Sequence, residues 1–319
     1  MSNYDLNIST ILIISPMYDE LKRLIEKENL EQSFRFKPEA EVADEDLDWA
    51  DAIACFNTKT DYNYSKVKWV HSLGAGVDRF LHNKTWDPQV LLTRTICSFG
   101  QRIAEYTLSY VLQDMQRHHL FQKDGREKRW KPRTPGLLKN AKAVIYGTGE
   151  IGQVTAKVLS QFGMDVYGVS RSGREKDFFK KVFTIDQQEH TGQSEWKDAD
   201  YIINTLPLTV ETEALFNDRF FSQFTEAGFI NVGRGASVDE EALIEALDED
   251  RLRFAVLDVF KEEPLPSGHP FWEHPNITVT PHISAVTTAD EAVACFIDTL
   301  RNIERNEKLV NQVDIEKGY

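Results

Sequence analysis

Short apolar runs alternate with amphipathic stretches along the first hundred residues of this chain. Residues 10–15, 50–56 and 67–73 have the length and composition of buried strands. Between the first two runs, residues 18–29 gather their large apolar side chains on one face of a predicted helix. Strands that alternate with helices predict βαβ units, which form a parallel sheet.

The same alternation resumes after residue 100. Helices are predicted at residues 105–121 and 151–162, and strands at residues 141–146, 164–169, 201–205, 228–232, 254–257 and 277–280. A final helix at residues 288–306 begins where this second sheet is complete, so we expect it to pack on the first half of the chain. The polar tail from Asn311 is expected to be poorly ordered.

These elements predict two α/β domains of the Rossmann-like or flavodoxin-like type. Each would be a doubly wound parallel sheet, with a cleft between the two domains. The first domain, residues 1–100 together with 284–319, is discontinuous, and the second comprises residues 101–283. Open parallel sheets bind ligands outside the carboxyl ends of their strands, so candidate functional residues are sought there.

Composition narrows the function classes. The net charge of −14 argues against a nucleic-acid partner, because phosphate binding needs a basic face. Three widely separated cysteines, Cys55, Cys97 and Cys295, indicate neither a disulfide framework nor a zinc site, and no metal is expected. No apolar run reaches the roughly 20 residues of a membrane span, and no signal peptide is recognised, so we expect a cytoplasmic protein without a membrane partner.

A glycine-rich turn joins a predicted strand to a predicted helix. Gly147 permits the tight turn, Gly149 lets backbone N–H groups approach a pyrophosphate, and Gly152 allows close packing of helix and strand. The phosphates would then meet the positive end of the helix. In this context the motif predicts a dinucleotide site formed by Gly147, Thr148, Gly149, Glu150, Ile151 and Gly152.

The end of the next strand bears on which dinucleotide binds. NAD sites usually carry an acidic residue there, which accepts a hydrogen bond from the ribose 2′-hydroxyl. In this chain Ser170, Arg171 and Ser172 occupy the position. Because a guanidinium holds a 2′-phosphate through charge-assisted hydrogen bonds, we expect NADP to be preferred over NAD. An exposed basic loop without a binding role is the alternative.

Three polar residues, Arg234, Glu263 and His282, each follow a predicted strand in the last third of the chain. Reduction of a 2-oxo acid needs a cation for the carboxylate, a donor that polarises the carbonyl, and an acid that protonates the alkoxide. Arg234 has donors for the first two tasks, and His282 can supply the proton. Glu263 would orient the imidazole and favour its charged form. Singly each residue is weak evidence, since a lone His after a strand is more often a capping or core residue, but their joint placement favours redox catalysis.

The chain resembles the D-isomer-specific 2-hydroxyacid dehydrogenases, a family that includes glyoxylate/hydroxypyruvate reductases and phosphoglycerate dehydrogenases. The matching segments, in family order, are residues 71–78, 104–105, 147–152, 231–235, 257–260, 262–264 and 280–284. The resemblance implies an NAD(P)-dependent oxidoreductase whose catalytic set is Arg234, Glu263 and His282. The short interval between Glu263 and His282 resembles the glyoxylate/hydroxypyruvate reductase branch, which implies reduction of such a small 2-oxo acid to the D-2-hydroxy acid.

The resemblance also implies further binding residues and a partner. The substrate would be held by Leu73, Gly74, Ala75 and Gly76, together with Arg234 and His282. Asp258 matches a residue near the nicotinamide carboxamide, and the other cofactor contacts match Leu206, Pro207, Val232 and Gly233. Family analogy implies a homodimer formed through the long helix at residues 105–121 and its neighbours.

Several alternatives stay open at this point. Some relatives of this fold are dinucleotide-sensing corepressors, and an NAD-dependent enzyme that oxidises a larger D-2-hydroxy acid would use the same residues. Arg94 replaces a residue that is often Asn in the family, which indicates either a site for a second acidic group of the substrate or a surface charge. Trp130 resembles a residue near the substrate or the dimer partner, although plain packing explains it equally well.

Overall fold

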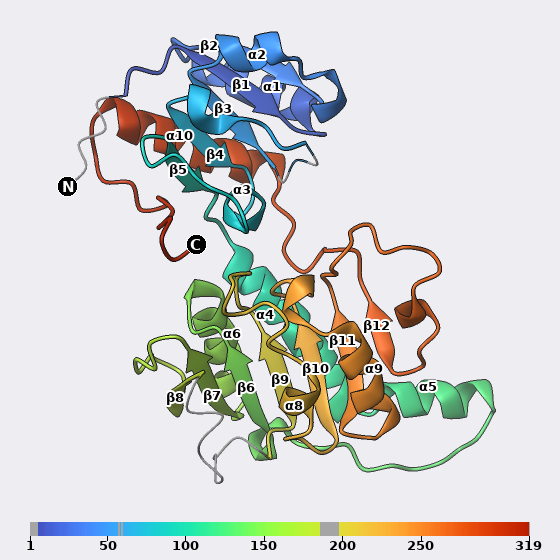
Figure 1. Cartoon of the computed structure of the whole chain (residues 1–319). Helices are drawn as coiled ribbons and strands as arrows, with labels where there is room; N and C mark the ends of the chain where they lie inside the picture. The colour runs from blue at the N-terminus through green and yellow to red at the C-terminus, as the bar shows by residue number, and fades with distance from the viewer. Residues whose placement is uncertain (1–5, 57, 59, 186–197, 319) are drawn as a thin grey trace. The chain divides into compact units, whose positions relative to one another are not determined.

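The chain divides into two compact units, each built around its own parallel sheet (Figure 1). The computed structural model describes residues 6–56, 58, 60–185 and 198–318. Unit 1 consists of Met1–Cys97 and Thr287–Tyr319, and unit 2 of Ser98–Val286. Sequence analysis places the divisions after residues 100 and 283, and the structure places them after Cys97 and Val286.

The sheet of unit 1 has five parallel strands in the order β2-β1-β3-β4-β5. This is the flavodoxin-like order, in which the chain reverses direction across the sheet after β2. The strands are β1 (Thr10–Ile14), β2 (Ser33–Lys37), β3 (Ala52–Cys55), β4 (Trp69–Ser72) and β5 (Leu91–Arg94). All residues of β3 and β4 are buried, because helices cover both faces of a parallel sheet.

Helix α10 (Ala289–Glu304) belongs to unit 1, although it comes from the far end of the sequence. It begins with a capping box formed by Thr288 and Glu291, and its apolar stripe enters the core of the unit. Phe296 stacks on Trp69 of β4 with ring centroids 5.3 Å apart. The other helices of this unit are α1 (Tyr18–Ile25), α2 (Asp44–Trp49) and α3 (Asp78–Leu81).

The segment after α10 is part of this packing. Asn311 is 5% exposed and Val313 is 4% exposed, and the backbone of Gln312 forms an antiparallel bridge with Thr93. The prediction of a poorly ordered tail from Asn311 is therefore wrong. A polar composition does not exclude order where a buried amide finds hydrogen-bond partners.

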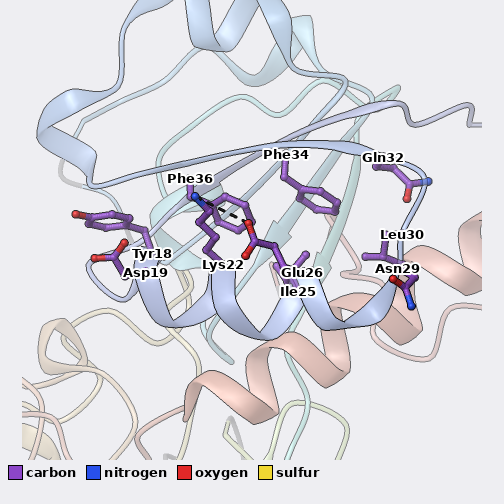
Figure 2. Close-up of a pocket in the computed structure, with 10 residues that line it drawn as sticks. All are labelled: Tyr18, Asp19, Lys22, Ile25, Glu26, Asn29, Leu30, Gln32, Phe34 and Phe36. Carbon is purple, nitrogen blue, oxygen red and sulfur yellow. Dashed lines mark ion pairs between the residues drawn. The ribbon is translucent and has the colours of Figure 1, made fainter.

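A groove of about 600 Å³ lies between α1 and β2, at the edge of the unit 1 sheet (Figure 2). Phe34 and Phe36 form its apolar floor, and the ion pair of Lys22 with Glu26 lies on its helical side. None of the site residues expected from the sequence lines this groove. It is therefore separate from the candidate active site.

The sheet of unit 2 has seven parallel strands in the order β12-β11-β10-β9-β6-β7-β8. Six of them reproduce the Rossmann order, in which the switch point lies between the first and fourth strands, here β6 and β9. The strands are β6 (Lys142–Tyr146), β7 (Asp165–Ser170), β8 (Lys181–Thr184), β9 (Tyr201–Asn204), β10 (Ala227–Asn231), β11 (Leu252–Leu257) and β12 (Ile277–Val279).

The long helix expected at residues 105–121 is two helices in the structure. Helix α4 (Phe99–Met115) starts earlier, and α5 (His118–Arg126) follows after a break. Arg117 has a positive φ of 58°, which a continuous α-helix does not allow. The other helices of unit 2 that the structure describes are α6 (Glu150–Gln161), α8 (Asp218–Phe221) and α9 (Glu240–Asp248).

Short 3₁₀ turns complete the described elements. They are η1 (Glu26–Glu28), η2 (Glu39–Glu41), η3 (Tyr64–Lys66), η4 (Leu138–Asn140), η5 (Gly235–Ser237) and η6 (Pro270–Trp272). Among the residues that the structure describes, no helix combines the length and apolarity that a bilayer crossing needs.

Candidate active site

The turn between β6 and α6 has the geometry of a phosphate-binding loop. Gly147 has a φ of +100°, and a Cβ atom on Gly152 would lie 1.8 Å from the Gly147 carbonyl oxygen. Both positions therefore require glycine for the local fold. A Cβ on Gly149 would meet nothing within 4 Å, so this glycine is not required by packing. The space beside Gly149 is the room that a pyrophosphate needs.

The amino end of α6 has the donors for such a phosphate. Gly149 is its N-cap and provides no side-chain cap, and no acceptor in the described ranges takes the N–H groups of Glu150 and Ile151. Thr148 is 6% exposed. The Thr205 hydroxyl oxygen lies 2.9 Å from the Tyr146 carbonyl oxygen and 3.1 Å from the Gly147 carbonyl oxygen, so it can donate a hydrogen bond to either. The loop residues fit a dinucleotide, since unpaired N–H groups at a helix start bind anions.

The end of β7 is a polar turn without a carboxylate. Ser170 Oγ accepts the N–H of Gly173 at 3.2 Å, so this hydroxyl is used to shape the turn. The Arg171 side chain is 61% exposed, and its Nε lies 3.9 Å from Glu211 Oε2 on the loop after β9. Ser172 Oγ accepts the N–H of Arg174. Arg171, the cation expected to bind a 2′-phosphate, is thus solvent-accessible, and it has an acidic neighbour, Glu211, that the sequence did not indicate.

Two buried amides hold the loops that follow β9 and β10. Asn204 Nδ2 donates to Asn231 Oδ1 and to Ser237 Oγ, both at 2.9 Å. Asn204 Oδ1 accepts the N–H of Leu206, and Asn231 Oδ1 accepts the N–H of Gly233. One hydrogen-bond network therefore anchors both segments that are expected to contact the cofactor, Leu206–Pro207 and Val232–Gly233. Sequence analysis missed Asn204, although a polar residue at the end of a buried strand is a usable signal.

Gly235, the residue after Arg234, allows the loop that carries Arg234 to approach the loop after β11. A Cβ on Gly235 would lie 1.9 Å from the carbonyl carbon of Phe260, so only glycine allows the two loops to approach. The Arg234 carbonyl accepts from Asn231 Nδ2 and Ser237 Oγ, which fixes the backbone. Its guanidinium Nη1 donates to the Gly233 carbonyl at 2.7 Å. The positive charge acts on the nearby Glu263 carboxylate.

Glu263 and His282 form a hydrogen-bonded pair. His282 Nδ1 lies 2.8 Å from Glu263 Oε2, and Glu263 Oε1 accepts the N–H of Phe260 at 2.9 Å. Burial raises the pKa of Glu263, but the hydrogen bond and charge of His282 outweigh this effect, and Phe260 and Arg234 add to it, so the pKa lies below its usual value. His282 Nε2 has no partner in the described part of the chain. A carboxylate on Nδ1 fixes the tautomer and presents Nε2 to a ligand.

Asp258 holds the loop that carries His282. Its Oδ1 accepts from Thr280 Oγ1 at 2.6 Å and from the N–H of Ile283 at 2.8 Å, and its Oδ2 accepts the N–H of Ser284 at 2.9 Å. The Tyr106 hydroxyl of α4 lies 2.7 Å from Thr280 Oγ1. His282 itself has a φ of +53°. A fully buried carboxylate thus stabilises a strained loop, and Tyr106 is a contributor that the sequence did not reveal.

The substrate loop predicted at Leu73–Gly76 lies in unit 1, directly after β4. Leu73 is 2% exposed, and its N–H donates to the Cys55 carbonyl at 2.8 Å. The N–H groups of Ala75 and Gly76 find no acceptor among the described residues. In the same described part of the chain, no group of three His, Cys, Asp or Glu side chains could hold a metal ion.

Comparison with known proteins decides the family. The family model for the NAD-binding domain of the D-isomer specific 2-hydroxyacid dehydrogenases matches residues 108–284, more than half of the chain. The chain belongs to this family. It is therefore an oxidoreductase that uses NAD or NADP, and the matched region lies within unit 2, which holds the glycine loop and the Glu263–His282 pair.

Individual relatives of this dehydrogenase agree with that assignment. It is 33% identical over 264 residues to glyoxylate/hydroxypyruvate reductase A of Serratia proteamaculans, covering 81% of this chain and 83% of the relative. A crystal structure of a family member from Aeromonas salmonicida is 30% identical, with a TM-score of 0.85 over 97% of this chain and 100% of the other. The NADPH-dependent glyoxylate/hydroxypyruvate reductase of Sinorhizobium meliloti, in complex with NADP and sulfate, is 26% identical, with a TM-score of 0.81 over 98% and 100% of the two chains.

Proposed function

We propose that this dehydrogenase uses NADPH to reduce a small 2-oxo acid, such as glyoxylate or hydroxypyruvate, to the D-2-hydroxy acid. The hydrogen bond between Glu263 and His282, in the unit that carries the glycine loop, is the observation on which this rests. Two similar proteins, those of Serratia proteamaculans and Sinorhizobium meliloti, are glyoxylate/hydroxypyruvate reductases, which supports the substrate class.

Each catalytic residue has a defined task in this proposal. NADPH, when bound, supplies the hydride for the C2 carbonyl carbon. His282 donates its Nε2 proton to the carbonyl oxygen as the hydroxyl forms, and the Glu263 carboxylate stabilises the imidazolium before that transfer. Arg234 binds the carboxylate of the substrate and polarises the C2 carbonyl. The loop Leu73–Gly76 of unit 1 provides N–H donors for an anionic substrate.

A screen of NADPH oxidation over a panel of 2-oxo acids tests this function. Turnover with glyoxylate or hydroxypyruvate is expected, and His282→Ala should keep NADPH affinity while losing turnover. Equal turnover in wild type and His282→Ala would refute the assignment of the acid. NADPH binding without turnover of any acid would favour a dinucleotide sensor, and turnover only of larger D-2-hydroxy acids with NAD would favour the oxidative alternative.

The preference for NADP is supported by the residues at the end of β7. Ser170 occupies the position at which NAD sites carry an acidic residue, and the guanidinium of the next residue, Arg171, is solvent-accessible. Arg171→Ala should weaken NADPH binding about tenfold and leave NADH binding unchanged, since a charge-assisted bond to phosphate is lost. Titration of each cofactor by fluorescence measures the ratio, and an unchanged ratio would refute the preference.

A homodimer best explains the apolar side chains that α5 and the following segment expose. Helix α5 and the segment that follows it expose large apolar side chains: Trp130 is 95% exposed, Leu137 58% and Phe121 39%. Exposed apolar residues gathered on one segment are typical of a protein interface. Sedimentation analysis of the wild type and of Trp130→Ser should show a dimer that the substitution weakens, and a monomeric wild type would refute the proposal.

A further inference from the structure

The carbonyl groups of the substrate loop are taken up by neighbouring donors in unit 1. Ser72 Oγ lies 3.0 Å from the carbonyl oxygen of Gly76, and the Gly74 carbonyl accepts from the N–H of Thr95 at 3.3 Å. The Ala75 carbonyl, between these two, accepts from Arg94 Nη1 at 3.1 Å. The N–H groups of Ala75 and Gly76, in contrast, find no acceptor in the ranges that the structure describes. A loop with paired carbonyls and available N–H groups is suited to an anion.

Arg94 is the last residue of β5, and its side chain reaches the substrate loop. The segment after α10 holds the backbone of Arg94 in place. The backbone N–H of Arg94 donates to the Asn311 carbonyl at 3.1 Å, and the Arg94 carbonyl accepts from Asn311 Nδ2 at 2.9 Å. Asn311 is 5% exposed, and its Nδ2 also donates to Thr299 Oγ1 of α10 at 2.7 Å. Each of these contacts lies within unit 1.

We propose that Arg94 and Asn311 are positioning residues for the substrate carboxylate. Asn311 fixes the backbone of Arg94, and the Arg94 guanidinium holds the Ala75 carbonyl so that the adjacent N–H groups remain available as donors. The positive charge of the guanidinium polarises the Ala75 peptide and adds to the attraction of an anion. This inference rests on the proposed function of the Leu73–Gly76 loop and gives the C-terminal segment a part in substrate binding.

Steady-state kinetics of the full-length enzyme with NADPH and glyoxylate test the role of Arg94. Arg94→Met should raise the KM for glyoxylate about tenfold, the size expected when a hydrogen bond from a charged group is lost. The dissociation constant of NADPH should stay within about twofold, because the cofactor loop is in unit 2. Arg94→Lys, which keeps the charge and a donor, should recover most of the loss. Arg23→Met removes an exposed cation of the same unit and serves as the matched control.

The role of Asn311 is tested by a second pair of variants. Asn311→Ala, like Arg94→Met, should raise the KM for glyoxylate. The double variant should raise it little further, because both residues act through the hydrogen bond from Arg94 to the Ala75 carbonyl. Lys308→Ala changes an exposed side chain of the segment after α10, so its KM should stay near the wild-type value. An unchanged KM in Asn311→Ala would overturn its part in the proposal.

Hydrogen exchange of the peptide that contains residues 73–77 provides a readout independent of turnover. Arg94→Met and Asn311→Ala should accelerate exchange in this peptide and leave the peptide with residues 147–152 unchanged. Unchanged exchange together with an unchanged KM would overturn the positioning role while the proposed reaction stands. If the wild type reduced no 2-oxo acid, the proposed function would fail, and the exchange experiment would still decide whether Arg94 and Asn311 hold the loop.

Discussion

Replacing Glu263 with Gln removes the negative charge beside His282 and keeps the shape of the side chain. Opposite unit charges about 4 Å apart attract by about 1 kcal/mol in water and about 4 kcal/mol at an effective dielectric constant of about 20. The side chains of His282 and Glu263 are 44% and 33% exposed, so solvent screens the pair in part. We therefore expect the imidazolium to lose about 1–3 kcal/mol of stabilisation.

This loss should appear in the rate of the reductase reaction, because the Glu263 carboxylate stabilises the charged form of the proton donor. At about 1.4 kcal/mol per factor of ten, Glu263→Gln should lower turnover about five- to hundredfold at neutral pH. The pKa of Glu263 lies below its usual value, because the hydrogen bond and charge of His282 outweigh the effect of burial. The two rates should therefore converge only in acid, where protonation of Glu263 removes the same charge from the wild type.

The assay is NADPH oxidation with saturating glyoxylate across a range of pH, with Glu262→Gln as the control. Glu262 is an adjacent, exposed carboxylate, and its replacement should leave the profile in place. A pH profile of Glu263→Gln that superimposes on that of the wild type would refute the argument that the charge of Glu263 stabilises the proton donor. A uniform loss at every pH would assign Glu263 to orientation alone.

Three further outcomes can be checked on the same protein. Gly149→Ala should leave thermal stability nearly unchanged but weaken NADPH binding at least tenfold, because the new Cβ meets only the space reserved for phosphate, as calorimetry and cofactor titration would reveal. Glu211→Gln should strengthen NADPH binding about two- to fivefold and leave NADH binding unchanged, since it removes a carboxylate near Arg171, and equal effects on both cofactors would contradict this. Burial raises the pKa of Asp46, but hydrogen bonds from Lys37, the Ala43 N–H and Arg35 outweigh it and hold the pKa below 3.8. The stabilisation from Asp46 is thus complete above about pH 4 and is lost as the pH falls through the folded value, so the wild type should exceed Asp46→Asn by about 1–3 kcal/mol at pH 6, with a gap that closes in acid denaturation curves.

The central strands of both sheets could be predicted from the sequence, while the edge strands β2, β5 and β8 were not. Strands such as β3 and β9 are short, mainly apolar runs that are fully buried, and such runs indicate strands in the sequence. Strand β2 was missed because Phe34 and Phe36 alternate with Arg35 and Lys37, and an edge strand buries only part of each side chain. The break at Arg117 carries no glycine or proline signal.

The site was predictable where its residues follow strands and unpredictable where it depends on tertiary contacts. Glu263 and His282 were placed together because each comes after a strand of one parallel sheet, and the structure pairs them at 2.8 Å. Tyr106 reaches Thr280 across 174 positions of sequence, so nothing local marks it. The left-handed backbone of His282 was equally invisible, because His adopts this conformation more often than most residues but still only in a small minority of positions.

The return of α10 to unit 1 determines the order in which the chain can fold during synthesis. Unit 2 is continuous in sequence and can form its sheet once Val286 has been made. Unit 1 must wait for α10, because Phe296 and the rest of its apolar stripe complete the core around Trp69. The first strands to leave the ribosome are thus among the last to be covered, and until then they expose an apolar sheet face to the cell. Substitutions that weaken α10 should therefore lower the yield of folded protein more than they lower the stability of the finished enzyme.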